Sequence, residues 1–178
     1  DDVYLPDHIQ TLTESIELAA EDELVVYTDM GTVDLQGKIQ ATYIRQSWIA
    51  DLSTRKSSFI ANLVQQSVSY PSAAFRTSAL VRANIPWHST SFPDTETTLL
   101  QSPLGTFKFV PKQTMLYRVN PDSTSRDLDP KERILGPFAS LTRVMASESF
   151  YLLCLEIQDV NRSSFSTAVL DGIQMRLG

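Results

Sequence analysis

The chain has 178 residues, of which 42% are hydrophobic and 20% charged, and its formal net charge at pH 7 is −6. This length suits one domain with a core, and this composition excludes an intrinsically disordered chain. The longest apolar run covers only residues 150–155, whereas a membrane-spanning helix needs about 20 apolar residues. The sequence therefore predicts a soluble, intracellular protein.

The charges are divided unevenly along the chain. Residues 1–34 contain ten Asp and Glu side chains and no Lys or Arg, so this segment carries −10 and residues 35–178 carry +4. Such an asymmetry is typical of an acidic segment that docks on a basic surface or shields it from anions. Acidity for solubility alone is the alternative. We therefore divide the chain into an acidic N-terminal arm, 1–34, and a single β-rich globular domain, 35–178.

The acidic arm is predicted to contain a helix followed by a strand. Ile9, Leu12 and Ile16 recur on one face of a helix over 8–20, and the carboxylates lie off this apolar stripe. The stretch 23–27 is rich in β-branched and aromatic residues, which predicts a short strand. The three apolar residues of the helix are candidate contacts with a neighbouring subunit.

The segments that follow alternate between apolar and polar residues. Strict alternation over 33–43 predicts a half-buried strand, and a second helix is expected over 57–69. Alternation resumes over 73–85, where Arg76 and Arg82 are six residues apart. An even spacing places both arginines on the same outward face of a strand.

The second half of the chain is expected to contain loops and further strands. Residues 86–98, rich in Pro, Ser and Thr, are predicted to form the longest and most mobile loop. A turn with Pro and Gly joins 99–101 to 106–110, which predicts a hairpin. The remaining predicted elements are strands over 113–119, 149–158 and 172–177 and a loop over 120–131.

These elements together predict the fold class. About seven strands against two helices, with turn signals at short spacing, favour a mainly β (α+β) protein. We expect an antiparallel β-sandwich or barrel-like domain with two peripheral helices. Strand content should then exceed helix content.

Few residues are suited to catalysis. The two histidines are His8, expected to be a neutral surface residue, and His88, which lies in the predicted loop 86–98. No G-x-S-x-G elbow surrounds a serine, and Cys154 within the apolar run 150–155 is expected to be a buried, inert thiol of a central strand. Because metal-ligand clusters and Gly-rich phosphate loops are also missing from the sequence, we predict no catalytic residue, no metal site and no cofactor.

Basic residues on the domain are the remaining candidates for binding. A patch of them would attract phosphates, acidic lipid headgroups or the acidic arm itself, with an affinity that falls as salt rises. Sequence-specific binding of nucleic acid is unsupported, because aromatic residues are not interleaved with the cations. The candidate anion- or partner-binding residues are Lys38, Arg45, Arg55, Lys56, Arg76 and Arg82.

The divided charge and the lack of a catalytic constellation favour a non-enzymatic structural protein that self-associates through its N-terminal arm. By fold-level analogy alone it would resemble coat or matrix proteins and could be part of a virion. The expected partners are copies of itself in a homo-oligomer, other proteins and, weakly and non-specifically, polyanions or acidic membrane surfaces. The candidate interface residues are Ile9, Leu12, Ile16 and Trp87. The alternatives are a β-sandwich module that binds a protein or peptide on a strand edge and an enzyme with a His88 loop site.

Overall fold

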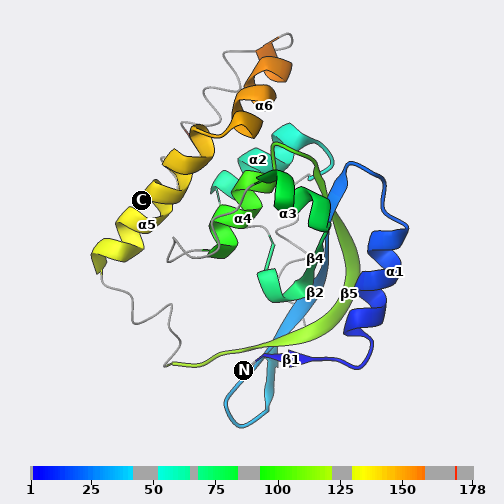
Figure 1. Cartoon of the computed structure of the whole chain (residues 1–178). Coiled ribbons are helices and arrows are strands. Elements are labelled where there is room, and N and C mark those ends of the chain that lie inside the picture. Colours follow the sequence, from blue (N-terminus) through cyan, green and yellow to red (C-terminus); the bar gives the residue numbers. More distant parts are fainter. Residues whose placement is uncertain are drawn as a thin grey trace.

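A computed structural model describes residues 2–41, 52–64, 68–83, 93–121, 130–158 and 171 (Figure 1). These residues form an α+β fold around one open, mixed sheet. The strands are β1 (Val3–Tyr4), β2 (Glu23–Val33), β3 (Ile39–Ala41), β4 (Ala73–Phe75) and β5 (Thr106–Arg118). The helices are α1 (His8–Glu17), α2 (Arg55–Val64), α3 (Thr77–Ala83), α4 (Pro93–Gln101), α5 (Pro130–Met145) and α6 (Glu148–Gln158), with a short 3₁₀ helix, η1 (Tyr70–Ser72).

Two long parallel strands, β2 and β5, form the centre of the sheet. Their register runs from Glu23 opposite Thr106 to Val33 opposite Arg118. β1 pairs antiparallel with the end of β5, whereas β3 and β4 pair antiparallel with β2. Most residues of β2 are buried irrespective of the face on which they lie, as expected for a strand that is covered on both sides.

Helices cover both faces of this sheet (Figure 1). α1 packs on β2, β4 and β5, and α2, α3 and α4 lie on the other side. There, Leu24, Val25, Tyr27 and Phe107 of the sheet pack with Ala79 of α3 in one hydrophobic cluster. A second cluster joins α2, α4, α5 and α6 through Phe59, Leu63, Leu99, Leu141 and Leu153.

The expected antiparallel β-sandwich or barrel-like domain is wrong. In the described part of the chain, six α-helices contain more residues than the five strands, and the strands form one open sheet whose two central members are parallel. The expectation of two helices only, and of more strand than helix, is therefore also wrong. Segments that were predicted as strands are helical at 77–83, 99–101 and 149–158.

The segment 149–158, predicted as a central strand, is helical and belongs to α6. A continuous apolar run does not distinguish a buried strand from a helix by its periodicity. Cys154 is consequently on a helix, where it is only partly buried against the second cluster rather than fully buried in a strand. This burial raises the pKa of the Cys154 thiol, which favours the unreactive protonated form.

Helix α4 occupies part of the predicted loop 86–98 and the predicted strand 99–101. Its first turn contains Pro93 and the acidic residues Asp94 and Glu96, which suit a helix N-terminus because of the fixed proline φ and the helix dipole. The polar residues that suggested a loop are instead buried in the interior of the protein. Residues 84–92 lie outside the described part.

Two other predicted strands are divided in the structure. Among the described residues of the segment 73–85, only 73–75 form a strand, and α3 follows it, so Arg76 and Arg82 do not share a strand face. The described part of the segment 33–43, residues 33–41, is the end of β2, a turn and β3. The turn contains Gly37 with φ of 83°, a backbone conformation that favours glycine.

Several predictions from local pattern are confirmed. α1 and α2 are helices within or overlapping the predicted ranges, and β2 begins at the predicted strand 23–27. β5 contains the predicted strand 106–110 and nearly all of 113–119 as one element. The predicted strand 172–177 and most of the predicted loop 120–131 lie outside the described residues.

Candidate functional site

A groove of about 540 Å³ runs beside α1. One wall is α1, which contributes Ile9, Leu12 and Ile16, and the opposite wall is η1 and β4, which contribute Tyr70 and Ala74. The structure therefore brings the three interface residues predicted on this helix to one mainly apolar groove. Their spacing explains this, because residues three and four apart lie on the same face of a helix.

The groove has an exposed apolar edge and a buried floor. Ile9 is 67% exposed, whereas Leu12, one turn further along α1, is only 5% exposed. Tyr4 of β1 also lines the groove and is largely exposed. Large apolar side chains that lie together at a surface mark interaction sites more often than isolated ones do.

A chain of buried hydrogen bonds lies where α1 meets the sheet. Nδ1 of His8 is 2.8 Å from Oγ1 of Thr114, which is 2.6 Å from Oγ1 of Thr28, and Thr28 donates to the carbonyl of Ser72 at 3.3 Å. Because each hydroxyl has one proton to donate, Thr114 donates to Thr28 and accepts from His8. The network thus assigns the Nδ1–H tautomer to His8.

His8 is a buried residue, so the expectation of a surface histidine is wrong. Burial lowers its pKa from the usual 6.5, and the Asp7 carboxylate partly opposes this shift. The ring also stacks on Tyr4, with centroids 4.1 Å apart and planes 5° apart. The signal that could have indicated burial is Leu12, four residues later on the same helical face.

We expect the stability of the protein to fall as the pH is lowered from about 7 to about 5, with His8 responsible for part of the fall. The pKa of His8 is lower in the folded than in the unfolded chain. The unfolded state therefore binds more protons below the ordinary histidine pKa, and stability is lost until the pH has passed the folded value. Urea unfolding at a series of pH values measures this.

The control for this experiment is His8→Asn, which keeps a neutral donor toward Thr114 but does not titrate. Its stability should change less between about pH 7 and pH 5. An unchanged slope in the variant would contradict the role given to His8. Asp7, whose pKa lies below its usual 3.8 because of a hydrogen bond from Lys112, contributes only at more acidic pH.

Lys112 of β5 holds the start of α1. Its Nζ lies 2.5 Å from Oδ2 of Asp7 and donates to Oγ1 of Thr11 at 3.1 Å. The Asp7 carboxylate is used in this ion pair and does not cap the helix. Both partners are well exposed, and exposed pairs of this kind contribute little to stability. The pair orients the helix over β5.

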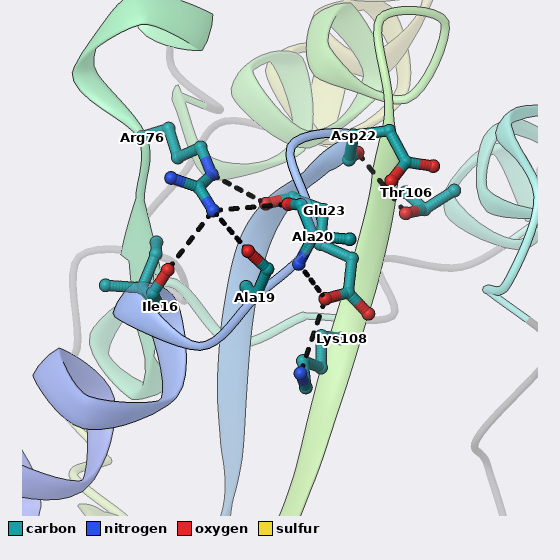
Figure 2. A network of polar contacts seen from close by, with 8 residues as sticks. All are labelled: Ile16, Ala19, Ala20, Asp22, Glu23, Arg76, Thr106 and Lys108. Carbon is teal, nitrogen blue, oxygen red and sulfur yellow. Dashed lines mark hydrogen bonds and ion pairs between the residues drawn. The ribbon is translucent and has the colours of Figure 1, made fainter.

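Arg76 holds the other end of α1 (Figure 2). Its guanidinium donates to the backbone carbonyls of Ile16, Ala19 and Ala20 at 2.9–3.2 Å and to the carbonyl of Glu23 at 3.0 Å. The last carbonyls of a helix have no partner within the helix and carry partial negative charge. Arg76, predicted to bind anions or partners, therefore binds the backbone of its own chain.

Other cations of β5 also contact the acidic segment. Lys108 pairs with Glu23 at 3.3 Å, and the same carboxylate accepts the backbone N–H of Ala20 (Figure 2). Arg118 donates its backbone N–H to Asp2 and a guanidinium N–H to the carbonyl of Asp34, both at 2.9 Å. Segment 1–34 thus supplies β1, α1 and the central strand β2, and it meets basic residues of its own chain.

The predicted cations do not come from one element. Lys38 lies in the exposed turn between β2 and β3, Arg55 and Lys56 in the first turn of α2, and Arg82 in α3. Nothing is described of the Arg82 side chain. Arg45, Trp87 and His88, the remaining predicted site residues, lie outside the described part of the chain.

The described residues were also searched for a metal site and for a membrane-spanning helix. They contain no group of three His, Cys, Asp or Glu side chains that could hold a metal ion. None of their helices is both long enough and apolar enough to cross a membrane. Comparisons with the known protein families and with curated proteins found no match to this chain.

Proposed function

We propose that this chain is a non-enzymatic structural protein that self-associates through the surface of α1. The observation that carries this proposal is the exposure of large apolar side chains on one short segment. Besides Ile9, Tyr4 is 54% exposed and Leu18 is 82% exposed. Burial of such a side chain at an interface is worth about 1.5–3 kcal/mol when it is complete.

The polar side chains near the groove make contacts within their own chain, which supports a non-enzymatic function. His8 donates from Nδ1 to Thr114 in the network above and stacks on Tyr4, so its ring is held by contacts within its own chain. Lys112 and Arg76 are occupied by contacts with α1. His8, Lys112 and Arg76 thus hold the helix on the sheet.

Ile9→Asp is expected to abolish self-association without unfolding the protein, because Ile9 is exposed and a carboxylate cannot be buried in an apolar contact. Light scattering coupled to size-exclusion chromatography would measure the mass over a range of concentrations. We expect the wild-type mass to rise above the 19.9 kDa of one chain and the variant to remain at that mass.

Val81→Asp is the matched control, since Val81 is equally apolar and exposed but lies on α3. It should associate like the wild type. A wild-type protein that stays at the mass of one chain at every concentration would contradict the proposal, as would an Ile9→Asp variant that associates normally.

A second candidate function, the binding of a segment from another protein, is favoured by the groove itself. Its volume lies within the range of about 300–1,000 Å³ that is common for ligand pockets, and Leu12 provides a buried apolar floor. A protein that never self-associates would favour this candidate over the first.

A further inference from the structure

The turn between β2 and β3 projects at the end of the sheet (Figure 1) and contains two exposed apolar side chains. We call residues 34–39 the hairpin tip. Leu35 is 48% exposed and Ile39 is 54% exposed. About half of each side chain is therefore in contact with water, and this apolar area is suited to burial against another surface.

Backbone contacts hold the hairpin tip in one conformation. The Asp34 carboxylate accepts the N–H groups of Gln36 and Lys38 at 3.0 and 2.8 Å, and the Asp34 N–H donates to the Lys38 carbonyl at 3.0 Å. A tip that is already ordered loses little conformational entropy when it binds. These contacts also leave the Lys38 side chain as the outward-facing charge of the tip.

The hairpin tip has one carboxylate, that of Asp34, which accepts backbone N–H groups of the tip, and one cation, Lys38. Among the described residues, no carboxylate pairs with the Lys38 side chain, which is exposed. Glu17 lines the groove and Glu14 lies one turn earlier on α1, and no cation of the described part of the chain pairs with either. The other charged groups at this end of the molecule, Asp7 and Lys112, neutralise each other.

We infer that the hairpin tip of one copy of this chain docks in the α1 groove of a second copy. This inference rests on the proposed self-association and names its two surfaces. Leu35 and Ile39 would enter the apolar groove, and Lys38 would lie beside Glu17. No residue of the hairpin tip lines the groove of its own chain, so the contact is between copies.

A contact between tip and groove explains the charges better than a contact between two α1 helices. α1 contains Glu14 and Glu17 and no Lys or Arg, so a second α1 would offer these carboxylates no cation, whereas the hairpin tip offers Lys38. The tip-to-groove contact is heterologous, because the two surfaces differ. Each added copy therefore leaves one tip and one groove open, and the assembly grows into a ring or a filament.

The test mixes two variants, each with one surface disabled. Ile9→Asp disables the groove, and Ile39→Asp disables the hairpin tip; each should have the mass of one chain by light scattering. Their equimolar mixture should form a dimer of about twice 19.9 kDa and nothing larger, because only one intact tip and one intact groove remain. Circular dichroism and unfolding of each variant would establish that both are folded.

Other outcomes distinguish this inference from the proposed function. If Ile9→Asp has the mass of one chain but Ile39→Asp associates fully, the α1 surface is used and the tip is not, which overturns the inference alone. A mixture that forms no dimer overturns it as well. A wild-type protein that never associates overturns both proposals.

A charge exchange tests the pairing of Lys38 with Glu17. Lys38→Glu and Glu17→Lys should each raise the dissociation constant about fivefold or more at low salt, and the chain carrying both should recover most of the affinity. Added salt should reduce all these differences. Equal affinity of wild type and both single variants would remove the charge pair from the contact.

Discussion

Arg143→Met is expected to destabilise the protein by about 3 kcal/mol, because it leaves the buried Glu96 carboxylate without its cation. Arg143 donates from Nε to Oε1 of Glu96 at 2.6 Å and from Nη2 to Oε2 at 2.5 Å, and Ser140 adds a hydrogen bond at 3.2 Å. Glu96 is fully buried, whereas the Arg143 side chain is 37% exposed. This exposure places the effect at the lower end of the range for buried pairs. Urea unfolding at pH 7 measures it.

The double variant Glu96→Gln, Arg143→Met serves as the internal control for this prediction. It removes both charges, so it should recover a substantial part of the lost stability. Lys38→Met, which removes an exposed cation, should change the free energy of unfolding by less than about 0.5 kcal/mol. A loss below about 1 kcal/mol in Arg143→Met would show that the pair does not hold α4 to α5.

Arg76→Ala is expected to cost about 2–3 kcal/mol, because hydrogen bonds from a charged donor are worth more than neutral ones and several carbonyls lose their partner together. These carbonyls belong to Ile16 of α1, to Ala19 and Ala20 just after the helix, and to the first residue of β2. Hydrogen exchange should accelerate in α1 while the centre of β2 stays protected. Self-association should weaken as well, since α1 forms one wall of the groove.

Arg76→Lys separates charge from geometry. A single ammonium group keeps the charge but cannot donate in the fork arrangement of a guanidinium, so this variant should recover less than half of the stability. Full recovery would mean that positive charge alone, and not the geometry of the contacts, holds the end of α1. Lys56→Ala provides a control for loss of a cation elsewhere on the molecule.

The sequence by itself determined the elements whose signals are local. The stripe of Ile9, Leu12 and Ile16 predicted the helix α1, and the β-branched residues at 23–27 predicted the start of β2. These signals depend on residues within one or two turns of each other, so no knowledge of distant contacts was required. The acidic segment and the basic remainder of the chain were also evident from composition.

Tertiary structure alone decided the state of the longer ambiguous segments. The run 150–155 suits a central strand or a buried helix equally, and only its packing against α2 and α5 selects the helix α6. The polar stretch that begins α4 was predicted as a loop because its residues are polar. Glu96 in this stretch can be buried because Arg143, 47 residues later, pairs with it. The sequence does not show which distant residue will form an ion pair with a given charged side chain.

The prediction of a cationic surface was limited in the same way, because the sequence does not show the partner of each cation. Charge counting indicated that the basic part of the chain would meet the acidic segment, and several of its cations do contact that segment. It could not indicate that Arg76 would bind carbonyl oxygens at the end of α1 or that the pKa of a buried His8 would fall. Which groups lose water, and which donors point at them, depends on the folded arrangement, because burial and hydrogen-bond geometry are properties of three-dimensional contacts.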